Sequence, residues 1–88
     1  MHLVLDIGNT NIKWALFDDN MLIDYQLIKD LSYNALKAII LKYQKINTLC
    51  VSNNTKRLHF ISKICDELSV KYIELSNSSK IPFFSLLI

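Results

Sequence analysis

The sequence DIGNTNIK, which begins at Asp6, combines residue types that suit the binding of a phosphate group and a metal ion. Asp6 ends a short apolar segment, where a carboxylate is costly to bury unless it is paired or holds a cation. Gly8, the only glycine of the chain, allows a turn with positive φ and lets an anion approach without a Cβ in the way. Polar side chains beside successive backbone N–H groups then form an anion-binding concavity: Asn9, Thr10 and Asn11. A carboxylate for Mg²⁺ next to donors for phosphate oxygens is the combination that phosphoryl transfer requires.

A second interpretation fits the same spacing. Asn and Gly are favoured in tight hairpin turns, so Gly8 and Asn9 are also explained by a hairpin that binds no ligand. The strand–turn–strand context and the expected burial of Asp6 favour the phosphate site.

Length and composition indicate one small domain with a hydrophobic core. The chain has 88 residues, of which 51% are hydrophobic, and this proportion excludes a disordered protein. No apolar run approaches the roughly 20 residues that span a bilayer, and the first residues do not resemble a signal peptide. We therefore expect a cytoplasmic protein with no membrane partner. The net charge of +2, without a continuous basic stripe, predicts no nucleic-acid partner.

The two cysteines, Cys50 and Cys65, lie in apolar periodic segments. We expect two reduced thiols in the core, as is usual for a cytoplasmic protein. A zinc site would need two more closely spaced ligands, and neither histidine supplies one. His2 is expected at the start of a strand and His59 on an exposed helix face.

Apolar alternation, helical spacing and turn residues predict the element order β-β-β-α-β-α-β. Asp18-Asp19-Asn20 reads as the hairpin turn, and Ser32 as the N-cap of the first helix. The expected elements are strands at 2–7, 11–18 and 21–28, a helix at 33–45, a strand at 46–52, a helix capped by Asn53, Asn54 or Thr55, and a strand at 70–75.

This order predicts an α/β fold with a mixed sheet, in which three antiparallel strands are followed by parallel strands reached through helices. It is the arrangement of a ribonuclease-H-like half-domain, with the first strand at or near the sheet centre. The carboxyl end of that strand then opens on the side where such folds bind ligands.

The DIGNTNIK stretch resembles the first phosphate motif of type III pantothenate kinases, which belong to the acetate and sugar kinase, Hsp70 and actin superfamily. The stretch LCVSNN, residues 49–54, is similar to a second short motif of that family. The resemblance implies an actin-like ATPase fold and the ATP-dependent phosphorylation of pantothenate, the first committed step toward coenzyme A. It also implies Mg²⁺, a monovalent cation (K⁺ or NH₄⁺) and a homodimer.

The resemblance also implies roles for individual residues. Asp6 would position the metal ion, and four residues of the turn would line the ATP phosphates: Gly8, Asn9, Thr10 and Asn11.

Three further residues carry two interpretations each. Lys13 is either a point charge at a phosphate or a half-exposed strand lysine. Ser52 and Asn53 either border the cleft or cap the following helix.

The family's Gly-x-Asp-Arg motif, whose aspartate is the proposed general base, has no counterpart here because the only glycine is Gly8. We therefore expect residues 1–88 to form the N-terminal ATP-binding half-domain, with no catalytic residue of its own and no activity alone.

Two other functions suit the same fold. A non-catalytic binding or assembly module would keep the actin-like fold without phosphoryl transfer. A ribonuclease-H-like nuclease would need further carboxylates that converge on Asp6, whereas Asp18, Asp19 and Asp24 are expected near the far end of the second strand.

Overall fold

The computed structural model describes residues 1–8, 10–52 and 58–75 of the chain. Its secondary structure follows the order that the sequence predicts. The elements are β1 (His2–Ile7), β2 (Ile12–Asp18), β3 (Met21–Ile28), α1 (Tyr33–Lys42), β4 (Thr48–Ser52), α2 (Phe60–Leu68) and β5 (Lys71–Leu75).

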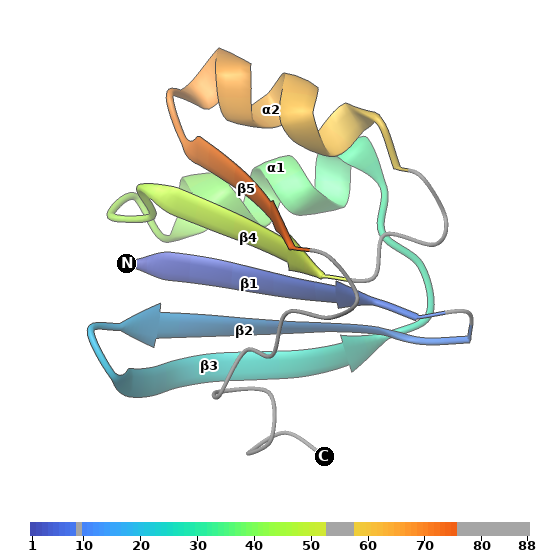
Figure 1. Ribbon diagram of the computed structural model, residues 1–88, viewed down its shortest axis with the longest axis horizontal. Helices are drawn as coiled ribbons and strands as arrows, with labels where there is room; N and C mark the ends of the chain where they lie inside the picture. The colour runs from blue at the N-terminus through green and yellow to red at the C-terminus, as the bar shows by residue number, and fades with distance from the viewer. Residues whose placement is uncertain (9, 53–57, 76–88) are drawn as a thin grey trace.

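The strands form one mixed sheet in the order β3-β2-β1-β4-β5 (Figure 1). β1 pairs antiparallel with β2 and parallel with β4. β3 is antiparallel to β2, and β5 is parallel to β4. The prediction of a mixed α/β sheet with a central first strand is confirmed, and the topology is that of the ribonuclease-H-like half-domain of the actin-like ATPase fold.

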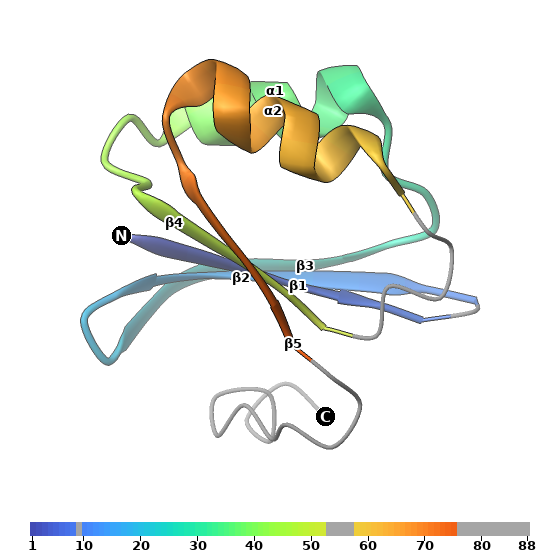
Figure 2. The same cartoon turned by 45° about the horizontal axis from the view of Figure 1, so that its top comes forward.

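The two helices lie over the same face of the sheet (Figure 2). We call this the helix face; it carries Leu3, Leu5 and Ile7 of β1, which are fully buried. Since side chains alternate along a strand, Val4 and Asp6 lie on the opposite face, which we call the second face.

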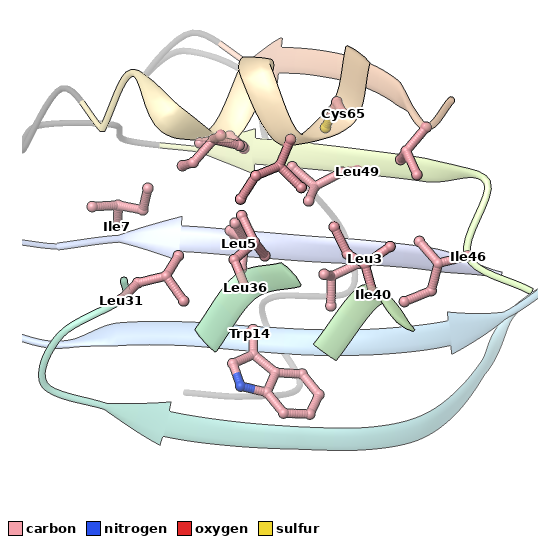
Figure 3. Packing of buried hydrophobic residues seen from close by; sticks show 14 of the residues in the cluster. Leu3, Leu5, Ile7, Trp14, Leu31, Leu36, Ile40, Ile46, Leu49 and Cys65 are labelled. Atoms are coloured by element: carbon pink, nitrogen blue, oxygen red, sulfur yellow. The ribbon is translucent and has the colours of Figure 1, made fainter. Parts of the chain in front are cut away.

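The core lies between the helices and the helix face (Figure 3). Each large aliphatic side chain buried there stabilises the fold by about 1.5–3 kcal/mol. The buried members of this cluster are Leu3, Leu5, Ile7, Ile12, Trp14, Leu16, Leu31, Leu36, Ile40, Ile46, Leu49, Val51, Ile61, Ile64, Cys65 and Val70.

α1 begins as the sequence predicts and ends earlier. The Ala35 N–H donates to the Ser32 hydroxyl at 3.1 Å, which confirms Ser32 as the N-cap. The helix ends at Lys42, not at Lys45, because Tyr43 leaves the helical conformation. The Tyr43 hydroxyl donates to Asp24 Oδ2 at 3.0 Å and so fastens the end of α1 to β3.

The predicted cap of α2 is wrong. The helix begins at Phe60 with His59 in the N-cap position, whereas Asn53, Asn54 and Thr55 lie outside the described residues. At its other end Ser69 adopts a left-handed conformation, with φ of 57°, and the Val70 N–H donates to the Cys65 carbonyl at 2.9 Å. None of the described helices is long and apolar enough to cross a membrane.

Replacing Leu5 by alanine is expected to lower the free energy of unfolding by about 2–5 kcal/mol, because the side chain is fully buried in the central strand. Urea denaturation followed by circular dichroism measures the change. The matched control is Leu41→Ala in α1, where the leucine is 52% exposed and the expected change is within about 0.5 kcal/mol. Equal losses in the two variants would contradict this assignment of the core.

Candidate phosphate- and metal-binding site

The connection between β1 and β2 is a tight turn. The Gly8 N–H donates to the Asn11 carbonyl at 3.0 Å, just beyond the last paired residues, Ile7 and Ile12. A Cβ added to Gly8 would lie 2.9 Å from the same carbonyl oxygen, closer than such atoms can approach without a shift.

The prediction of positive φ at Gly8 is wrong, since that glycine does not have a positive φ. Among the described residues, positive φ occurs at Asp19 and Ser69. What requires glycine at position 8 is therefore the close approach of the Asn11 carbonyl across the turn.

The side chains of the turn are accessible. Thr10 and Asn11 are both exposed, and the Asn11 side-chain amide donates to the Thr10 hydroxyl at 3.5 Å. Asn9, the remaining predicted phosphate ligand, lies outside the described residues. Gly8, Thr10 and Asn11 thus lie together at the carboxyl end of β1, as the sequence predicts.

Three polar residues lie side by side across the centre of the sheet. Asp6 of β1 is the register partner of Lys13 on β2 and of Ser52 on β4. Register partners project from the same face, so all three side chains belong to the second face. Neighbouring strands are about 4.8 Å apart, so this Lys13–Asp6–Ser52 row spans about 10 Å.

The row is bordered by apolar side chains. At the same level, Leu27 pairs with Lys13 and Leu75 pairs with Ser52. The next row of the second face is mostly apolar and consists of Tyr25, Ala15, Val4, Cys50 and Ile73. Charges beside apolar protein surface interact more strongly than charges surrounded by water.

Asp6 is less buried than the sequence suggests, whereas Ser52 in the same row is buried. Asp6 is partly buried rather than fully buried, because it is the penultimate residue of β1 and lies where the sheet ends. Lys13 is also partly buried. Ser52 is only 6% exposed and is the buried polar residue of the described ranges.

Ser52 does not cap α2, which begins at Phe60 with His59 in the N-cap position. Of its two interpretations, a position beside the candidate site is the one that fits the structure. Asn53, which shared both interpretations, lies outside the described residues.

The aspartates of the β2–β3 hairpin and of β3 lie away from Asp6, and Glu74 of β5, the register partner of Val51, lies on the helix face. Asp18 and Asp19 are in the β2–β3 hairpin, at the opposite end of β2 from Lys13. Asp24 accepts the bond from Tyr43 on the helix side of the sheet. Within residues 1–8, 10–52 and 58–75, no group of three or more His, Cys, Asp or Glu could hold a metal ion. The second face of the described residues therefore provides one carboxylate at this end of the sheet, with a lysine as its register partner on β2.

Both cysteines are free thiols. Cys65 is buried in the core of the helix face, whereas Cys50 is partly buried on the second face, so only Cys65 fits the expectation of a core thiol. Burial raises the pKa of both thiols, and that of Cys65 to about 11. Because the thiolate is the nucleophilic form, neither residue is suited to nucleophilic chemistry at neutral pH.

The family model of type III pantothenate kinases matches residues 2–78 of the chain. The chain belongs to the type III pantothenate kinase family. Membership associates it in general with kinases of coenzyme A biosynthesis, and the match includes the turn and all five strands of the sheet. The sequence has no match among curated proteins.

The sequence allowed Ser52 to border the cleft, but it did not predict that Ser52 is the register partner of Asp6. The two residues are far apart in the chain and meet only through the parallel pairing of β1 with β4. The polar residue at the end of a short apolar strand was the signal, and it was equally compatible with a helix cap.

Replacing Gly8 by alanine is expected to lower the free energy of unfolding by about 1–3 kcal/mol, because the added methyl group collides with the Asn11 carbonyl. Thermal or urea unfolding measures the loss. Thr10→Ala in the same turn is the control, with an expected change within about 0.5 kcal/mol because Thr10 is exposed. A Gly8→Ala variant as stable as the control would show that the turn does not need this close approach.

Alkylation of Cys65 by iodoacetamide is expected to accelerate about tenfold per pH unit until the pH approaches 11, since only the thiolate reacts and its pKa is raised to about 11. The measurement uses the Cys50→Ser variant, so that Cys65 is the only thiol, and circular dichroism verifies the fold at each pH. The denatured chain provides the reference for an ordinary thiol. A rate that levels off near pH 9 in the folded chain would contradict the raised pKa.

Proposed function

We propose that this chain binds Mg²⁺-ATP through the β1–β2 turn and the Lys13–Asp6–Ser52 row, as the nucleotide-phosphate-binding half-domain of a pantothenate kinase. The observation that carries the proposal is the register of β1, which pairs the one carboxylate of the site with a lysine directly beside a tight glycine turn. The membership of the chain in a kinase family supports the same function.

Asp6 suits Mg²⁺. Its carboxylate is partly exposed at the end of the sheet. Mg²⁺ is usually held by one or two carboxylates together with water and phosphate oxygens, so a single aspartate is a sufficient protein contribution. When bound, the ion neutralises charge on the transferred phosphoryl group.

The turn and Lys13 suit the phosphates. The backbone at Gly8 has no Cβ between it and an approaching anion, and the exposed Thr10 and Asn11 side chains can donate hydrogen bonds to phosphate oxygens. Asn9 belongs to the same proposed set by its place in the motif. Lys13 would hold a phosphate as a point charge, and its partial burial limits the screening of that charge by water.

The resemblance to the family extends the proposal to pantothenate as the acceptor, to a monovalent cation (K⁺ or NH₄⁺), to a homodimer and to the cytoplasm. We also propose that residues 1–88 need a second half-domain that supplies the general base. The 88-residue chain alone is then inactive, and turnover of pantothenate by the purified chain would refute this part of the proposal.

Replacing Asp6 by asparagine is expected to weaken the binding of Mg²⁺-ATP at least about tenfold, or ~1.4 kcal/mol, because the carboxylate that faces the metal ion loses its charge. Isothermal titration calorimetry measures the affinity. Asp18→Asn is the control, since it makes the same charge change at the opposite end of β2, where the residue is exposed, and should leave the affinity unchanged.

Equal effects of the two variants, or no binding of Mg²⁺-ATP by the unaltered chain, would contradict the proposed function. A lack of binding would favour the non-catalytic binding or assembly module, which needs the same fold and no nucleotide.

A further inference from the structure

β3 is the outermost strand on its side of the sheet, so one of its backbone edges has no neighbouring strand among the described residues (Figure 1). An open edge of this kind is a template for pairing with another chain. Of the five exposed large hydrophobic residues in the described ranges, four lie on β3: Met21, Ile23, Tyr25 and Leu27, which are 42–68% exposed. The strand therefore favours self-association, because a second copy presents the same edge and the same apolar side chains.

The hydrogen-bonding pattern of the sheet shows which backbone groups face the open edge. Along an antiparallel pair of strands, bonded and non-bonded residue pairs alternate. The Gly8 N–H donates to the Asn11 carbonyl just beyond β1, so these two residues form a bonded pair. Every second pair along the ladder is then bonded, which includes Val4 with Ala15. Ala15 therefore directs its backbone groups toward β1, and its partner on β3, Tyr25, directs its own toward the open edge.

The side chain of Asp24 occupies the backbone donor at this point of the edge. Its Oδ1 accepts the Tyr25 N–H at 2.8 Å, and its Oδ2 accepts the Tyr43 hydroxyl at 3.0 Å. A strand that paired with β3 here would have to take the Tyr25 N–H away from Oδ1. The charged carboxylate would then lose a donor in a place that water no longer reaches, which opposes the pairing.

β3 is also irregular at the same place. Its pairing with β2 passes from Asp24 directly to Leu22, which leaves Ile23 as an extra residue. This is a β-bulge, which bends the strand and increases its twist. Bulges and charged side chains are both devices by which edge strands avoid pairing with other chains. Two such devices therefore meet at the middle of the open edge.

We propose that Asp24 is an edge guard: its carboxylate occupies the backbone donor of Tyr25 and prevents β3 from pairing with β3 of a second copy. Two copies related by a two-fold axis would pair antiparallel through this edge and would close as a dimer. The exposed apolar side chains would stabilise that dimer, and the bonds of Asp24 oppose it. The proposal does not depend on the binding of a nucleotide.

Sedimentation equilibrium over a range of protein concentrations tests the guard. We expect Asp24→Ala to self-associate at least about tenfold more strongly than the unaltered chain, because a hydrogen bond to a charged acceptor is worth about that factor. Asp18→Ala is the matched control, since it removes the same charge from an exposed residue of the hairpin and should stay within about threefold. Adding Tyr25→Lys to Asp24→Ala places a charge on the open edge and should reverse the increase.

A further variant separates the guard from the attachment of α1. Tyr43→Phe removes the hydroxyl that bonds Oδ2 and leaves the bond between Oδ1 and the Tyr25 N–H. Its self-association is expected to stay within about threefold of that of the unaltered chain. An equal increase in Tyr43→Phe and Asp24→Ala would show that loosening α1 is sufficient, and it would overturn the role of Asp24 as a guard.

Amide hydrogen exchange followed by NMR tests the contact in the unaltered chain, and it covers the case in which the alanine variant does not fold. By the same alternation the Leu27 N–H faces the open edge. We expect the Tyr25 N–H to exchange at least about tenfold more slowly than the Leu27 N–H, because Asp24 bonds the former. Equal exchange rates, or a folded Asp24→Ala variant that associates no more strongly than Asp18→Ala, would overturn the proposal.

Discussion

The pairing register of β1 is the constraint on which the rest of the structure depends. Side chains alternate between the two faces of a strand, so a slip of one residue would move Asp6 from the second face into the core. The register is fixed by apolar packing, because Leu5 is paired with Trp14 on one side and with Val51 on the other. The free energy of the hydrophobic core therefore determines where the polar side chains of the candidate site lie.

The same register brings residues from three strands to one place. Lys13 and Ser52 approach Asp6 from opposite sides, and the turn at Gly8 closes directly beyond them. Because β1 and β4 are parallel, their carboxyl ends meet at one edge of the sheet (Figure 1). Polar groups at that edge can meet a ligand without disturbing the core on the helix face.

The local features, the mixed sheet and its central first strand were predictable from the sequence, whereas the exact pairing register was not. The bounds of β1 and β3 and the Ser32 cap follow from side-chain period and local hydrogen bonding. The reason for glycine at position 8 was predicted incorrectly, because it depends on how the chain returns toward Asn11 rather than on φ. Ser52 beside Asp6 depends on a pairing between distant segments, which the period of either strand does not specify.

The central claim is that phosphate and Mg²⁺ bind at the carboxyl end of β1. Its most direct test is to titrate the isotope-labelled chain with Mg²⁺ and a non-hydrolysable ATP analogue and to follow the backbone amide signals by NMR. We expect the largest shifts at Gly8, Thr10, Asn11 and Lys13, and none at the β2–β3 hairpin around Asp19. Shifts centred on that hairpin, or no shifts at saturating analogue, would contradict the claim.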